Sequence, residues 1–368
     1  MGCLVWYVSA HGYGHAVRSA LVLAELHRRA PALALHVRAA APRWLFPEAV
    51  RYAPLVADFG LVQHDSVTID FAGTLRRAAE FAAAWPAQVA AEAAYLRAVG
   101  ATLVVGDIPP LAFAAARQAG LPAVGLANFS WDWIYASYAD TWPDFGRLAA
   151  AARAAYQGTA LLLRLPFHGD LSAFPRQLDL PLVARVAPGP RAYYRQRLGL
   201  PLDRPCVLLS FGGLGLERFP YARLATWRDY LFVSTEAPAA APPPNLRVLP
   251  ARQTAYHELV RACDAVVTKP GYGIVADCLA ARTPVLYTDR GPFPEYPILA
   301  AALETSGPAL HLPRAALLAG ELGPYLNRLL ALDRPWRVPR LDGAAVAAAQ
   351  LLAMLGGGPL LDTHGAGP

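Results

Sequence analysis

Short apolar runs alternate with helical patterns along the first half of the chain. Five runs predict buried strands, at 4–9, 33–38, 102–106, 122–127 and 160–164. Three stretches between them are amphipathic or alanine-rich and predict helices, at 14–29, 74–99 and 110–118. Strands that alternate with helices are typical of βαβ units, so we expect an α/β fold with a parallel sheet.

The same pattern restarts after a proline-rich segment at 166–190, which we interpret as a connection between domains. Strands are predicted at 206–210, 230–234, 246–249, 265–268 and 284–287. Helices are predicted at 220–227, 255–261, 273–280 and 298–305. We therefore expect two Rossmann-like domains, at 1–180 and 181–340, and a flexible glycine-rich tail at 357–368.

Composition agrees with two packed domains and narrows the partners. The chain has 368 residues, of which 55% are hydrophobic and 16% charged, so it can bury two cores. The net charge of +6 is spread along the chain, which argues against a nucleic-acid surface and suits an anionic substrate such as a diphosphate.

Cysteine usage and the apolar segments bear on the compartment. The four cysteines are widely separated and form no CxxC motif, so we expect free, buried thiols in a reducing cytoplasm. No apolar stretch is long enough to predict a transmembrane segment, and the first residues read as a strand instead of a signal peptide.

A glycine-rich loop joins the first strand to the first helix. It contains His11, Gly12, Gly14 and His15. The glycines allow a tight turn and close approach of a ligand, and a neutral imidazole in the first helical turn can act as a general base. Asp107 ends the strand at 102–106 and could orient this base or, equally, cap the next helix. The histidines could also serve only to shape the turn.

Two further glycine-rich loops lie in the second half. One contains Gly212, Gly213 and Gly215, which resemble a phosphate-binding turn without completing a dinucleotide fingerprint. The other contains Lys269, Gly271, Tyr272, Gly273 and Asp277. Its glycines expose amides to a phosphate, its aspartate lies one turn into the helix within reach of a ribose hydroxyl, and Lys269 is the single lysine of the chain. The alternative is that the glycines only form turns and the lysine is solvated.

No Asp-x-Asp motif or other metal-ligand spacing occurs. We therefore expect no metal and no cofactor apart from the substrate, so that helix dipoles and basic side chains stabilise the diphosphate.

Four motifs together resemble one known family. They are His-Gly-Tyr-Gly-His-Ala at 11–16, Asn-Phe-Ser-Trp-Asp-Trp-Ile-Tyr at 128–135, Leu-Arg-Leu-Pro-Phe at 163–167 and Lys-Pro-Gly-Tyr-Gly at 269–273. The chain resembles the glycosyltransferase-like N-terminal region of plant-type L-arabinokinases and their stand-alone bacterial relatives and, more distantly, GT-B glycosyltransferases. The likeness runs from Val5 to about Tyr325, without the galactokinase-like half, so arabinokinase activity is not expected.

The resemblance implies a GT-B fold, with two Rossmann-like domains facing across a cleft and a C-terminal helix at 341–356 that returns to the first domain. It implies that His15 lies on the acceptor side and that the 212–215 and 271–277 loops hold the diphosphate and ribose of the donor. Asp277 stands where the wider family has glutamate. Donor-sugar contacts are implied for Arg290 and Glu295, and base contacts for Arg252, Gln253 and Tyr256.

Three hypotheses for the function remain. The leading one is transfer of a sugar from a nucleotide-sugar, with UDP as the expected nucleotide, to an unidentified acceptor hydroxyl with inversion. His15 is then the base, and Trp131, Asp132 and Trp133 are candidates for sugar contact or simply buried aromatic residues. The alternatives are a nucleotide-sugar 2-epimerase, which needs acidic groups such as Asp107, Asp289 and Glu295, and a non-catalytic module that binds a sugar-nucleotide and regulates a partner.

Overall fold

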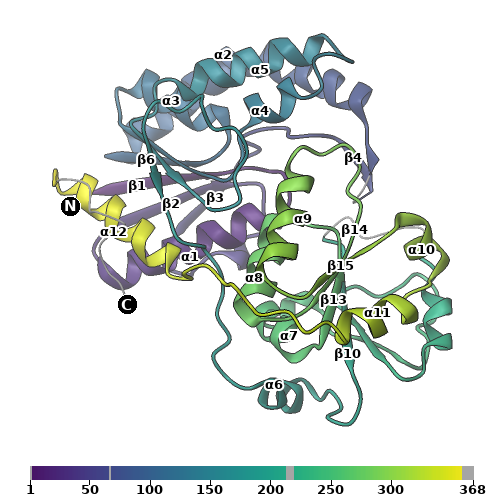
Figure 1. Cartoon of the computed structure of the whole chain (residues 1–368). Coiled ribbons are helices and arrows are strands. Elements are labelled where there is room, and N and C mark those ends of the chain that lie inside the picture. The colour runs from purple at the N-terminus through teal and green to yellow at the C-terminus, as the bar shows by residue number, and fades with distance from the viewer. Residues whose placement is uncertain (1, 66–67, 213–218, 359–368) are drawn as a thin grey trace. The chain divides into compact units, whose positions relative to one another are not determined.

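The computed structural model of the chain describes residues 2–65, 68–212 and 219–358 (Figure 1). It consists of two compact units. The first comprises residues 1–62, 70–183 and 340–368, and the second comprises residues 63–69 and 184–339. The division after Val183 lies close to the predicted boundary at 180/181, but the short segment at 63–69 goes with the second unit. There Thr68 accepts a hydrogen bond from Arg314 at 3.4 Å, a contact between distant positions that sequence patterns do not reveal.

The first unit contains a seven-stranded sheet whose paired strands are all parallel. In spatial order its strands are β3 (Arg51–Pro54), β2 (Ala34–Ala39), β1 (Cys3–Val8), β6 (Leu103–Asp107), β7 (Ala123–Ala127), β8 (Leu161–Arg164) and β9 (Gln177–Asp179). The five central strands were predicted from their apolar runs. The two edge strands were not, because they are short and their residues are largely exposed or half-buried.

Helices cover both faces of this sheet (Figure 1). They are α1 (Tyr13–Arg29), α2 (Phe71–Ala98), α3 (Pro110–Ala119), α4 (Trp131–Ala136), α5 (Asp144–Tyr156) and α12 (Gly343–Leu355), with a short 3-10 turn, η1 (Arg43–Leu45). Helix α2 begins where the Asp70 side chain accepts a hydrogen bond from the Gly73 amide at 2.7 Å. Helix α1 packs against α12 on one face, and α3 packs against α2 and α5 on the other.

The second unit contains a six-stranded parallel sheet and a small hairpin. The sheet order is β12 (Leu246–Val248), β11 (Leu231–Ser234), β10 (Cys206–Ser210), β13 (Ala265–Thr268), β14 (Val285–Thr288) and β15 (Ala309–Leu312). The hairpin pairs β4 (Gln63–Asp65) with β5 (Thr68–Ile69). The helices are α6 (Arg191–Leu198), α7 (Tyr256–Ala262), α8 (Tyr272–Ala281), α9 (Glu295–Ser306), α10 (Arg314–Ala319) and α11 (Gly323–Leu330). The described residues of this unit also form the 3-10 turns η2 (Tyr221–Thr226), at a predicted helix, and η3 (Ala251–Gln253).

Both sheets have the same Rossmann-like order, and each therefore contains one point where the chain direction across the sheet reverses. These switch points lie between β1 and β6 in the first unit and between β10 and β13 in the second. Ligands of open parallel sheets bind at the carboxyl ends of the strands that flank such a point. The three predicted glycine-rich loops follow β1, β10 and β13.

Two expectations from composition concern the cysteines and the membrane. All four cysteines are free and buried, as predicted. Across the three ranges described above, no helix combines the length and apolar character needed to cross a bilayer.

The C-terminal helix α12 is part of the first unit. The Leu182 amide donates to the Arg340 carbonyl at 2.8 Å, and Val183 forms an antiparallel bridge with Asp342. At the first residue of α12, a Cβ on Gly343 would lie 2.2 Å from the Pro181 carbonyl oxygen. A glycine is therefore required where the chain returns.

We predict that Gly343→Ala lowers the free energy of unfolding by about 1–3 kcal/mol, because backbone must move to admit the methyl group. Denaturant unfolding followed by circular dichroism measures this. Gly146→Ala is the matched control: its Cβ would meet only Ala139 at 3.7 Å, inside α5, and should stabilise the protein by about 0.5–1 kcal/mol. Unchanged stability of Gly343→Ala would show that the close approach is not a constraint.

Candidate active site

The loop between β1 and α1 is held against the neighbouring strand. The Ser9 amide donates to the Asp107 carbonyl at 3.2 Å, which ties the loop to the end of β6. Gly12 precedes α1 with φ of 82°, a left-handed conformation that favours glycine, and a Cβ there would meet nothing within 4 Å. Gly14 and His15 follow in the first helical turn, and His15 is 6% exposed.

The structure brings the two predicted catalytic residues together. His15 Nδ1 lies 2.8 Å from Asp107 Oδ1, and Asp107 is fully buried as the last residue of β6. Burial alone would raise the pKa of this carboxyl, but the charges and hydrogen bonds of Arg18 and His15 outweigh it and lower the pKa to about 2. Asp107 is thus ionised. The alternative role as a helix cap does not apply, because Pro109 is the N-cap of α3.

Three residues of this network were not predicted. Arg18 donates to both oxygens of Asp107, at 2.8 Å from Nε and 2.5 Å from Nη2, and Ser19 donates to Oδ2 at 2.8 Å. Arg18 also donates to Asn128 Oδ1 at 2.6 Å, just beyond β7. The signal for Arg18 was present in the sequence, since an arginine three residues after a candidate base lies on the same face of the helix.

A second buried carboxylate, Asp58, supports the other end of the loop. Its oxygens accept hydrogen bonds from the Ala10 amide and from Trp131 Nε1, each at 2.9 Å. Burial raises the pKa of Asp58, although these hydrogen bonds oppose the shift. His11 lies edge-on to Trp131, with ring centroids 5.3 Å apart. Asp58 lies in an irregular segment, and no sequence signal indicated it.

The aromatic cluster predicted for sugar contact is packed inside the unit. Trp131 is fully buried, stacks on Tyr135 at 5.4 Å and supports the histidine loop through its hydrogen bond to Asp58. Asp132 is 6% exposed and pairs with Arg153 of α5 at 3.2 Å. Direct sugar contacts of these two residues stay a prediction.

In the second unit, two glycines adjoin the switch point. Gly212 follows β10 with φ of 74°, and a Cβ on it would meet no atom of the described residues within 4 Å. Gly271 is the N-cap of α8 in extended conformation, and its Cβ would also meet nothing within 4 Å. As far as the described residues go, the space beside both backbones is open, as a ligand that approaches the amides requires. Gly213 and Gly215 lie outside the described residues.

Lys269 lies between β13 and α8, beside charged partners. Burial lowers the pKa of its ammonium to about 7, the neighbouring Arg290 adds to the shift, and Glu295 and Asp65 oppose it. Arg290 donates to Glu295 at 2.8 Å and to the Pro270 carbonyl at 3.3 Å. The structure therefore places Lys269 near Arg290 and Glu295, and their assignment to the donor side stays a prediction.

Arg185, which the sequence did not indicate, contacts two of the residues predicted to bind the ribose and the base. Both carboxylate oxygens of Asp277 accept hydrogen bonds from Arg185, whose guanidinium lies 5.4 Å from the Tyr256 ring. The Tyr256 hydroxyl pairs with Ser210 Oγ at the end of β10. Tyr272 and Gly273 form the first turn of α8, and Tyr272 is buried. Arg252 and Gln253 are exposed in η3.

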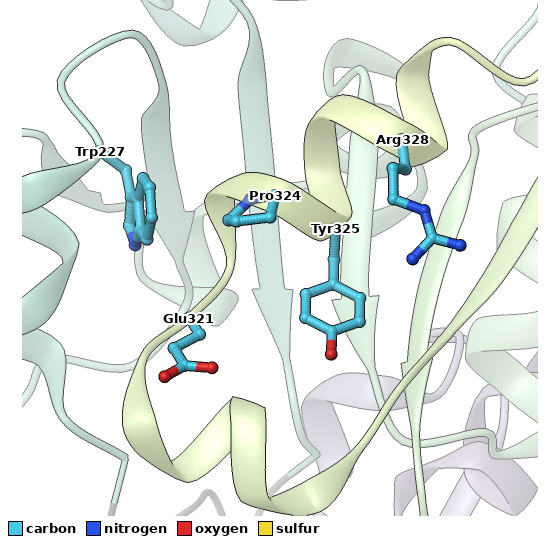
Figure 2. A pocket seen from close by; sticks show the side chains of 5 residues that line it. All are labelled: Trp227, Glu321, Pro324, Tyr325 and Arg328. Atoms are coloured by element: carbon cyan, nitrogen blue, oxygen red, sulfur yellow. The ribbon is translucent and has the colours of Figure 1, made fainter.

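A separate hollow lies elsewhere in the second unit. It has a volume of about 300 Å³ and is lined by five residues that belong to none of the predicted sites (Figure 2): Trp227, Glu321, Pro324, Tyr325 and Arg328. Among the residues that the structure describes, no group of three or more His, Cys, Asp or Glu side chains could hold a metal ion.

The chain resembles known proteins in sequence and in fold. No protein-family model matches the chain. L-arabinokinase of Arabidopsis thaliana is 32% identical over 352 residues, which covers 93% of this chain and 33% of that protein. The calicheamicin glycosyltransferase CalG4 superposes with a TM-score of 0.65 at 18% identity over 96% of this chain and 98% of that one. UGT89C1 of Arabidopsis thaliana, in complex with UDP, gives 0.61 at 12% identity over 96% and 99%.

The chain has the GT-B fold. The predicted α/β architecture and the resemblance to the glycosyltransferase-like region of L-arabinokinase are thereby confirmed. The chain spans about a third of the length of L-arabinokinase. Within this GT-B protein, His15 and Asp107 lie at the switch point of the first sheet, and Gly212, Lys269 and Gly271 lie at that of the second.

Proposed function

We propose that this protein is a glycosyltransferase that moves a sugar from a UDP-sugar to an acceptor hydroxyl, with His15 as the general base. The observation that carries the proposal is the buried His15–Asp107 pair at the switch point of the first sheet, 2.8 Å between Nδ1 and Oδ1. The similar solved structures named above are glycosyltransferases, and one holds UDP, which supports the class of reaction and the donor.

In the proposed reaction, His15 Nδ1 keeps its proton through the hydrogen bond to Asp107, and Nε2 removes the proton of the acceptor hydroxyl. The acceptor oxygen forms a bond to the anomeric carbon from the side opposite UDP. The bond between that carbon and the diphosphate oxygen breaks, UDP leaves with the electron pair, and the configuration inverts. The imidazolium formed on His15 is stabilised by the ionised Asp107.

The donor diphosphate is assigned to the second unit. Backbone amides at Gly212 and at the N-terminus of α8 can donate to phosphate oxygens, and the helix dipole favours an anion there. Lys269 adds a positive charge when it is protonated. We propose that these groups suffice without a metal ion.

Transfer is favoured over 2-epimerisation by the state of the carboxylates. Epimerisation by elimination needs acidic groups that are available to the sugar. Asp107 accepts hydrogen bonds from Arg18, His15 and Ser19. Glu295 is paired with Arg290, and Asp289 is paired with His311 at 2.9 Å.

The four free cysteines support a cytoplasmic location.

We predict that His15→Ala lowers the rate of transfer by a factor of about 10²–10⁴, because the reaction loses its base. Transfer is measured as UDP release from a panel of UDP-sugars and acceptors. The UDP dissociation constant should stay within a few-fold of the wild-type value, since His15 belongs to the first unit. A variant that turns over normally would refute the base assignment.

We predict that UDP affinity falls by about tenfold between pH 7 and pH 9, because Lys269 loses its proton in this range while UDP stays fully ionised. Calorimetry measures the dissociation constant. Lys269→Arg keeps its charge and should remove most of this pH dependence.

Gly271→Val should weaken UDP binding by more than tenfold with an unchanged melting temperature, since its side chain would occupy the open space beside α8.

The same titrations in EDTA and in Mg²⁺ should give one dissociation constant. If the affinity requires Mg²⁺, the metal-free donor site is wrong. If all three proteins bind UDP equally at every pH, the second unit does not hold the diphosphate at Lys269.

A further inference from the structure

Arg18 occupies a position that the proposed chemistry does not yet explain. It lies one turn after His15 on α1 and is 4% exposed. Its guanidinium joins three segments that are distant in the sequence: α1 itself, the end of β6 at Asp107 and the residue after β7, Asn128. A buried arginine is costly unless it is paired, so its partners must compensate for lost hydration.

The contact with Asp107 is bidentate. Nε lies 2.8 Å from Oδ2 and Nη2 lies 2.5 Å from Oδ1, the fork geometry in which arginine grips a carboxylate most strongly. His15 Nδ1 shares Oδ1 with Nη2. Arg18 therefore fixes the plane of the carboxylate. The carboxylate in turn orients the imidazole ring through its Oδ1 atom.

Arg18 Nη2 also lies 3.0 Å from His15 Nδ1. A guanidinium only donates hydrogen bonds, so it can bond to Nδ1 only when the imidazole proton is on Nε2. Such a tautomer could not act as a base through Nε2. When the proton is on Nδ1 instead, it is donated to the ionised Asp107, which is the stronger, charge-assisted bond. The carboxylate thus selects the tautomer with a free Nε2, provided that it stays ionised and in place.

The charge of Arg18 has a second consequence. A lone carboxylate beside an imidazole favours the imidazolium, which cannot accept a proton. Here the guanidinium compensates that carboxylate and is itself adjacent to the ring. Asp58 is a further buried carboxyl group, and His15 is among the groups that act electrostatically on it. Its hydrogen bonds come from Ser9, Ala10 and Trp131 and none from Arg18, so substitutions at Arg18 leave its partners in place.

We propose that Arg18 is a positioning residue that holds Asp107 in place and compensates its charge, so that the neutral His15 ring carries its proton on Nδ1 and presents Nε2 as the proton acceptor. The proposal deepens the role of His15 and, for its kinetic consequence only, rests on the proposed glycosyl transfer.

The test is a titration of the histidine ring nitrogens by ¹⁵N NMR on the full chain, with His15 assigned by its loss in His15→Ala. In the wild type, neutral His15 should carry its proton on Nδ1. In Arg18→Gln the uncompensated Asp107 should favour the imidazolium, and the midpoint of the His15 titration should rise by about one pH unit. Arg18→Lys keeps a cation and should leave the midpoint within a few tenths of the wild-type value.

Arg38→Gln is the matched control. Arg38 forms a similar bidentate pair with Glu92, at 3.0 and 2.5 Å, in the same unit, and the two side chains are 13% and 6% exposed. Its loss should lower stability without moving the His15 midpoint. This separates an effect on His15 from the general cost of removing a buried ion pair.

An unchanged midpoint in Arg18→Gln, or neutral wild-type His15 protonated on Nε2, would overturn the proposal. If Arg18→Gln does not fold, Arg18→Lys decides: a midpoint shifted by a full unit despite the retained charge contradicts it. Where transfer is measurable, kcat/KM of Arg18→Gln should recover at alkaline pH. Because the NMR result needs no substrate, failure of glycosyl transfer would leave this test intact.

Discussion

The buried carboxylate of Asp107 is the interaction on which the first unit's site depends. It lies at the end of β6, adjacent to the strand that carries the histidine loop, and it accepts hydrogen bonds from Arg18, His15 and Ser19. Ser19 in turn accepts a hydrogen bond from the indole of Trp6 at 2.9 Å, which extends the network into β1. A fully buried charge is tolerated only with such compensation. Both the stability of the fold and the candidate chemistry therefore require that Asp107 keeps its hydrogen-bond donors.

The two units share a strand order but have different chemistry at their switch points. In the first, ionised and aromatic side chains gather around a histidine. In the second, glycines leave open space beside the backbone, and one half-buried lysine supplies the charge. This difference fits a division of labour in which one unit handles a proton and the other an anion. The proposed glycosyl transfer requires such a division, because His15 removes a proton in the first unit and the diphosphate binds to the second.

Sequence patterns predicted what local rules determine. Apolar runs located the central strands, and glycines beside strand ends located the loops after β1, β10 and β13. The partners that complete the site are set by contacts across the fold. Arg18 reaches Asp107 and Asn128 from 89 and 110 positions away, and Arg185 meets Asp277 across 92. The edge strands β3 and β9 were also not predicted, because their exposed residues do not form an apolar run.

The most direct test of this account is hydrogen–deuterium exchange of the full chain with and without UDP. The account predicts slower exchange of the amides at Gly212 and at 271–273, where the phosphates are assigned, and little change in peptides that contain only the 10–15 loop. Protection confined to the 10–15 loop, with none near Gly212 or Gly271, would contradict it.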